Sequence, residues 1–101
     1  MKHRLQVSSA AHNDLEEICF WYEFHDPDLK MRFLNAVNEI INQILLYPAS
    51  CPVVYKYYRR GVVSGFPYNV LFKVDKDTIK IVSISHHNRS PSVLKKRADE
   101  R

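Results

Sequence analysis

The sequence has little cysteine and no long hydrophobic run. Cys19 and Cys51 stand far apart and in no C-x-x-C or histidine-paired spacing, which argues against a disulfide framework or a zinc site. No segment approaches the roughly 18 consecutive apolar residues that span a bilayer, and the N-terminus lacks the apolar core of a signal peptide. We therefore expect a cytoplasmic protein with no metal, no cofactor and no membrane partner.

Internal repeats, low-complexity runs and interdomain linkers are also missing from the sequence. At 101 residues with 46% hydrophobic content, the chain can bury one core but not two. We expect a single domain over residues 1–101.

Charge is divided unevenly between the two halves of the chain. Residues 1–50 hold four basic and seven acidic residues, a net charge of −3, and residues 51–101 hold eleven basic and four acidic residues, a net charge of +7. The two halves give the total of +4. A basic half beside an acidic half favours an anionic partner, either a nucleic acid or an acidic polypeptide, on one side of the domain.

Residues 3–7 alternate weakly and predict a short strand, which a helical pattern follows. Ser8 or Ser9 offers an N-cap, and we expect the helix to end near His25. The apolar residues of its buried face are Ala11, Leu15, Ile18, Cys19 and Tyr22, and the carboxylates expected mostly off that face are Asp14, Glu16, Glu17 and Glu23.

A second helix follows almost at once. Pro27 excludes Asp26 from the helical region, while Asp26 as N-cap with Pro27 in the first helical position starts the next helix. Its apolar stripe consists of Phe33, Val37, Ile40, Ile41, Ile44 and Leu45. So short a link predicts an antiparallel helical hairpin.

From Val53 onward the composition turns to β-branched and aromatic residues. We predict one strand within residues 53–64, a second over 68–75 and a third over 78–85, with a turn at 75–77. In the last strand, apolar residues occupy both sets of alternating positions, which predicts a central place in the sheet. The expected fold is α+β, a two-helix hairpin packed on a mostly antiparallel sheet in the order β-α-α-β-β-β.

This order, together with particular residues, resembles the RelE/ParE superfamily of type II toxins over essentially the whole chain. Phe66-Pro67-Tyr68 before the penultimate strand and the His-x-x-Arg-x-Pro run of residues 86–91 resemble its ParE-like, or plasmid-stabilisation, branch. The other residues that carry the resemblance are Ala11, Asp14, Leu15, Ile18, Phe33, Ile40, Ile41, Pro48, Arg60 and Phe72.

The resemblance implies the toxin of a type II toxin–antitoxin pair, neutralised by a cognate antitoxin. The ParE branch inhibits an essential target such as DNA gyrase by binding, and this is the function we expect. The alternative is the RelE branch, a ribosome-dependent endoribonuclease that cleaves mRNA without a metal. A third interpretation is an inactive or repurposed family member.

Ribonuclease chemistry would need an acid, a base and a cation at the phosphate. His86 or His87 can exchange protons near neutral pH, and Arg89 or Arg60 can hold the phosphate. Asn69 occupies the place where RelE-like toxins tend to carry an arginine, and Leu94 aligns with the usual tryptophan of the ParE-like pattern, so the chain departs from both branches. Because neighbours on a strand point to opposite faces, only one of the two histidines can line a given pocket. We interpret His86 as the structural one.

Binding residues are expected among the cations of the second half. Arg59 and Arg60 form a basic patch beside the sheet that can meet an anion or an antitoxin carboxylate, and the basic tail adds Arg89, Lys95, Lys96 and Arg97. Trp21 and Phe20 flank the stripe of the first helix, and one of them is expected to mark an exposed apolar edge that an antitoxin helix covers.

Overall fold

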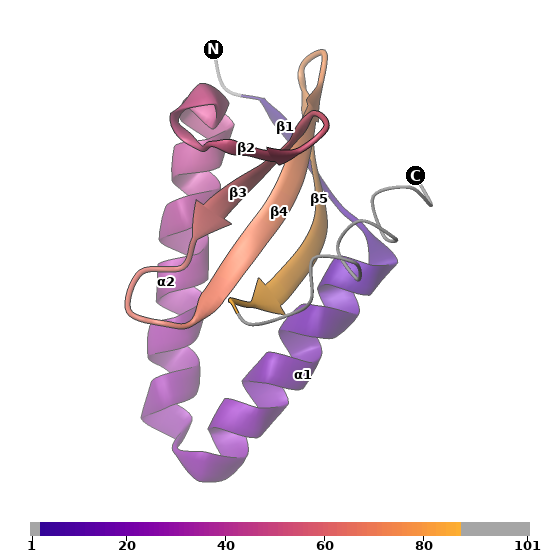
Figure 1. Ribbon diagram of the computed structural model, residues 1–101. Coiled ribbons are helices and arrows are strands. Elements are labelled where there is room, and N and C mark those ends of the chain that lie inside the picture. The colour runs from indigo at the N-terminus through magenta and orange to yellow at the C-terminus, as the bar shows by residue number, and fades with distance from the viewer. Residues whose placement is uncertain (1–2, 88–101) are drawn as a thin grey trace.

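The computed structural model describes residues 3–87, in which two helices cover one face of a five-stranded sheet (Figure 1). The strand order is β1-β5-β4-β3-β2, with β1 parallel to β5 and the other neighbours antiparallel. The elements are β1 (Arg4–Val7), α1 (Ser9–His25), α2 (Pro27–Leu46), a 3-10 turn η1 (Pro48–Ser50), β2 (Val53–Tyr55), β3 (Tyr58–Val62), β4 (Tyr68–Asp75) and β5 (Thr78–His86). The predicted α+β fold with a mostly antiparallel sheet is confirmed.

Side-chain caps set the helical hairpin. The hydroxyl of Ser8 accepts the Ala11 N–H at 3.0 Å and begins α1. Asp26 ends α1 by donating its N–H to the Tyr22 carbonyl at 2.7 Å, and its carboxylate accepts the Asp28 N–H at 3.0 Å to begin α2. Neither helix is long and apolar enough to cross a membrane.

The main core lies between the helices and the sheet. Its largest fully buried side chains are Phe33 and Ile44 of α2, Phe72 of β4, and Ile79 and Ile81 of β5. Strand β5 carries an extra residue, Val82, because Phe72 pairs with Ile81 and Leu71 with Ser83. This bulge lets both Ile81 and Ile84 face the main core while Val82 joins a smaller cluster.

The smaller cluster consists of Tyr58, Leu71 and Val82, with Tyr55 packed against it. It lies on the face of the sheet away from the helices, which we call the second face. The apolar side chains of β5 therefore pack on both faces of the sheet. β5 lies between β1 and β4, which is the central position that the pattern predicts.

The prediction of one strand within residues 53–64 is wrong, because the segment folds into β2 and β3. The chain reverses at Lys56, whose φ of 51° lies in the left-handed region, and Tyr55 pairs with Tyr58 across the turn. Neither Lys56 nor Tyr57 is a typical turn residue. The segment therefore has the composition of a continuous strand although it contains a hairpin.

Candidate functional site

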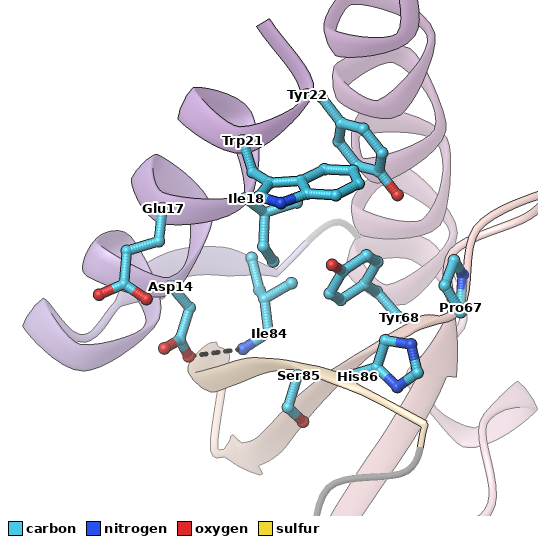
Figure 2. A pocket seen from close by; sticks show the side chains of 10 residues that line it. All are labelled: Asp14, Glu17, Ile18, Trp21, Tyr22, Pro67, Tyr68, Ile84, Ser85 and His86. Carbon is cyan, nitrogen blue, oxygen red and sulfur yellow. Dashed lines mark hydrogen bonds between the residues drawn. The ribbon is translucent and has the colours of Figure 1, made fainter. Parts of the chain in front are cut away.

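A groove of about 490 Å³ separates α1 from the paired ends of β4 and β5 (Figure 2). One side of α1 lines it at helical spacing, through Asp14, Glu17, Ile18, Trp21 and Tyr22. The opposite wall consists of Pro67, Tyr68, Ile84, Ser85 and His86. The i, i+3, i+4, i+7, i+8 spacing is visible in the sequence, but only the fold shows that β5 lies against it.

Aromatic side chains form much of the wall. Figure 2 shows Trp21 on the helix side of the groove and Tyr68 on the sheet side, with Ile18 and Ile84 beside the space between the two rings. The ring of Trp21 stacks on His25 with centroids 3.9 Å apart, and Nδ1 of His25 donates to the Trp21 carbonyl oxygen at 2.8 Å. Trp21 is thus held in place although it remains 54% exposed.

The hydroxyl of Tyr22 adds no charge to this groove. Burial raises the pKa of Tyr22, and the neighbouring Tyr68 hydroxyl raises it further through charge and a hydrogen bond. Tyr22 therefore stays protonated near neutral pH.

The two carboxylates of the groove have different surroundings. Asp14 is 7% exposed, and its Oδ2 accepts the Ile84 N–H at 3.0 Å and the Ser83 hydroxyl at 3.5 Å. The prediction that groups Asp14 with carboxylates off the buried face is wrong, because Asp14 caps the edge of β5 beyond the end of β1. Glu17 is exposed and makes no ion pair with any residue in the range 3–87.

The structure separates the two predicted histidines. His86 lies in the groove with its ring edge-on to Tyr68, the centroids 5.4 Å apart. His87 follows the strand and is exposed, and its backbone N–H donates to the Pro67 carbonyl at 2.9 Å. The main chain of His87 thus ties the strand end to the loop before β4. The predicted cations Arg89, Lys95, Lys96 and Arg97 lie outside the described residues.

Arg59 and Arg60 do not form one patch. Nη1 of Arg59 donates to the Cys51 carbonyl at 2.6 Å, and Arg59 shares the helix side of β3 with Gly61. Arg60 is exposed and pairs with Leu71, which places it on the second face with Tyr58. Adjacent side chains of a strand point to opposite faces of the sheet, so of the two arginines only Arg60 lies on the second face.

The second face combines cations with tyrosines. Nζ of Lys73 lies 5.7 Å from the centroid of the Tyr57 ring and 5.8 Å from that of Tyr58. Asn69 precedes Leu71 by two residues on the same face, and its buried Oδ1 accepts no hydrogen bond from the part of the chain that the structure describes.

The exposed apolar edge predicted on α1 is larger than expected. Both Phe20 and Trp21 are exposed, at 74% and 54%, and Phe24 is exposed at 81%. The i, i+4 spacing of Phe20 and Phe24 is the signal that sequence reasoning missed. Within residues 3–87, no group of three or more His, Cys, Asp or Glu side chains is placed to hold a metal ion.

Comparisons with known proteins agree with this architecture. Residues 5–91 match the family model of the ParE toxin of the type II toxin–antitoxin system parDE. The chain is 28% identical to the protein Y4kP of Sinorhizobium fredii, over 92% of this chain and 98% of the relative, and 26% identical to toxin ParE2 of Mycobacterium tuberculosis, over 93% and 90%.

Solved structures share the fold at lower identity. A chain of the chromosomal ParDE toxin–antitoxin system from P. aeruginosa superposes with a TM-score of 0.73 at 18% identity, covering 84% of this chain and 96% of that one. The YoeB dimer from Staphylococcus aureus gives a TM-score of 0.63 at 17% identity, covering 86% and 99%. Because the family model matches most of the chain, this protein belongs to the ParE toxin family of type II toxin–antitoxin systems.

Proposed function

We propose that this toxin arrests growth in the cytoplasm by binding an essential protein, with DNA gyrase as the favoured target, and that it does not cleave RNA. The supporting observation is that two of the groups expected to act in RNA cleavage, His86 and Arg60, lie on opposite faces of the sheet. The imidazole of His86 lies on the helix side, in the groove, whereas the guanidinium of Arg60 belongs to the second face. An acid–base group and a phosphate-binding cation must reach the same phosphodiester.

Asn69 supports the same proposal. It lies on the second face near Arg60, at the position where the ribonuclease branch tends to carry an arginine. An amide has no positive charge to stabilise the phosphorane that forms when the 2′-hydroxyl attacks. The second face is therefore weaker as a catalytic site than as a binding surface.

Side chains of the second face suit protein recognition. Arg60 is exposed, Tyr57 is 61% exposed, and Lys73 lies over the tyrosine rings. Arginine and tyrosine are among the residues that carry most of the binding energy at protein interfaces. We propose that Arg60 and Tyr57 contact the target. These cations can also hold phosphates, and this is the observation that favours the alternative function, mRNA cleavage.

Two assays on the purified chain separate these functions. We expect the chain to block supercoiling of relaxed plasmid by DNA gyrase or to trap cleaved plasmid, and to leave cell-free translation intact. Cuts at fixed codon positions that appear only when ribosomes are present would contradict the proposal and support the ribonuclease alternative.

A matched pair of variants tests the second face. Arg60→Ala should weaken gyrase inhibition about tenfold or more, as loss of an interface anchor does, whereas Lys76→Ala, in the exposed turn between β4 and β5, should leave it unchanged. In cells, the chain alone should arrest growth and its antitoxin should restore it. Normal growth at verified expression would indicate an inactive or repurposed protein.

A further inference from the structure

Strand β1 forms one edge of the sheet, and its outer side offers backbone groups for hydrogen bonding. Arg4 and Ser8 donate their backbone N–H groups inward, to carbonyl oxygens at and just before β5, at 2.7 and 2.9 Å. Because successive residues of a strand direct these groups to alternate sides, the N–H and C=O groups of Leu5 and Val7 point away from β5. Within residues 3–87 no strand pairs with that side.

This edge lacks the features that usually keep an edge strand from pairing. Such strands carry lysine or proline, contain a bulge, or are very short. The four residues of β1 include no lysine or proline and pair with β5 in a regular register, and Leu5 and Val7 are 43% and 44% exposed. The opposite edge strand, β2, follows Pro52, has three residues and pairs irregularly. β1 is therefore the edge that is open to pairing.

A second copy of β1 fits this edge in one antiparallel register that uses all four outward groups. When Leu5 lies opposite Val7 of the second copy, the two-fold axis places Val7 opposite Leu5, and the two pairs exchange four hydrogen bonds. A register centred on Leu5 would need His3, whose N–H is already donated to the Leu45 carbonyl at 3.2 Å. A register centred on Val7 would need Ser9, which belongs to α1.

The side chains suit this register. Gln6 lies opposite its own copy on the two-fold axis, in a pair whose Cα atoms are about 4.5 Å apart, and one carboxamide can donate to the other. Leu5 meets Val7 on the face that carries the main core. Arg4 comes opposite Ser8, beside a hollow of about 320 Å³ that gives it room. No like charges of β1 face each other.

From this geometry we infer that the chain forms a weak homodimer in which two β1 strands pair across a two-fold axis and join the two sheets into one. Four residues from each copy bury less than the roughly 1,200 Å² of a stable interface, and the net charge of +4 on each copy opposes association. The dimer is therefore weak, and salt strengthens it by screening the repulsion.

Dimerisation through β1 leaves both surfaces described above accessible. β1 lines neither the groove nor the part of the second face that holds Arg60 and Tyr57. The two-fold axis of an antiparallel strand pair is perpendicular to the sheet, so the second faces of both copies lie on the same side. The inference goes beyond the proposed function and does not depend on gyrase as the target.

The first test is sedimentation velocity of the purified full chain, without antitoxin, over a wide concentration range. We expect a dimer with a Kd on the order of 100 μM at physiological salt and a lower Kd at high salt. Gln6→Lys sets two ammonium groups against each other and should raise Kd about fivefold or more. Asn38→Lys adds the same charge at an exposed site of α2 and should change Kd less than about twofold.

A second test probes the register directly by mild oxidation and non-reducing electrophoresis. Gln6→Cys should form a disulfide between copies, because its two Cα atoms lie within the span that a disulfide bridges. Arg4→Cys should not, because its two copies lie about 13 Å apart along the paired strands. The unmodified chain, with Cys19 and Cys51, gives the background. Both substituted side chains are exposed, and circular dichroism verifies that each variant is folded.

Three outcomes would overturn the inference. One is a chain that stays monomeric up to about 1 mM, well above the expected Kd. Another is equal cross-linking of the Gln6→Cys and Arg4→Cys variants, which would indicate random collision. The third is a dimer that Gln6→Lys leaves intact, which would place the contact on another surface. None of these measurements involves gyrase, so a failure of the proposed function is distinguishable from a failure of this inference.

Discussion

Asp14 joins α1 to the sheet through one buried carboxylate. Its Oδ2 accepts the backbone N–H of Ile84 at 3.0 Å, beyond the last pair of β1 with β5, where no strand of residues 3–87 lies beside β5 on that edge. A buried N–H that loses its acceptor costs about 1–3 kcal/mol. One helical side chain therefore replaces a strand partner in this fold.

Asp14→Ala should lower the free energy of unfolding by about 1–3 kcal/mol, because the Ile84 N–H is left without an acceptor. Asp14→Asn keeps an acceptor oxygen of the same reach and should lose less. Urea unfolding followed by circular dichroism measures both. If the two variants were equally unstable, the carboxylate charge rather than the hydrogen bond would be the stabilising feature.

Gly61 allows α2 to approach β3 closely. A Cβ at this position would lie 2.8 Å from Cγ1 of Ile40 and 3.1 Å from Cδ1 of Ile44. We expect Gly61→Ala to destabilise the fold by about 1–3 kcal/mol through overpacking. In an Ile40→Ala background, the same change should cost less, and equal costs in both backgrounds would show that the contact is relieved elsewhere.

At the scale of elements, the caps decide where α1 begins. Ser8 accepts the Ala11 N–H, and its hydroxyl also donates to the Val82 carbonyl at 3.4 Å, so one side chain caps the helix and contacts β5. Ser9 is the first helical residue and is exposed. The sequence leaves the choice between the two serines open, because both can act as an N-cap.

Ser8→Ala should therefore destabilise the fold by about 1 kcal/mol or somewhat more, while Ser9→Ala should change stability by less than about 0.5 kcal/mol. Thermal unfolding of the two variants beside the unmodified chain gives both values. A larger loss for Ser9→Ala would mean that the helix begins one residue later.

Local signals explain which elements can be predicted. Asp26-Pro27 fixes both the end of α1 and the start of α2 in the sequence, because it constrains backbone angles and supplies a cap. The turn at Lys56 has no such signal, since its left-handed φ of 51° is set by the pairing of β2 with β3. Elements with a local chemical cause are predictable, and turns set by tertiary pairing are not.

The candidate site shows the same limit more strongly. The histidine pair at the end of the last strand and the exposed aromatics of α1 are visible in the sequence, but the groove exists only because His86 of β5 is brought beside Trp21 of α1. Arg59 and Arg60 are adjacent in the sequence, yet they serve opposite faces. The pairing of the strands decides which cations lie on the same face, and the sequence alone does not show that pairing.

At the scale of the whole molecule, we expect charge to affect the association rate of a partner more than its dissociation rate. The half of the chain after residue 50 has a net charge of +7. Arg60 is exposed on β3, Lys56 and Lys76 are exposed in the turns between strands, and five further cations belong to residues 88–101, outside the described residues. Such a field speeds the encounter with an acidic partner and is screened by salt. We expect apolar contacts of exposed side chains such as Trp21 to govern dissociation instead.

Replacing Lys95, Lys96 and Arg97 by Glu changes the net charge of the chain from +4 to −2. For an antitoxin tail that is acidic overall, we expect the association rate constant to fall about tenfold at low salt, with a weaker salt dependence, while the dissociation rate stays within about twofold. Stopped-flow association at several salt concentrations measures the first effect, and displacement by excess unlabelled toxin measures the second. Trp21→Ala is the matched control, because it should change dissociation and leave association nearly unchanged. If the triple variant lost binding at high salt as well as at low salt, the tail would be a buried anchor of the complex, since screening removes steering but not the loss of a packed contact.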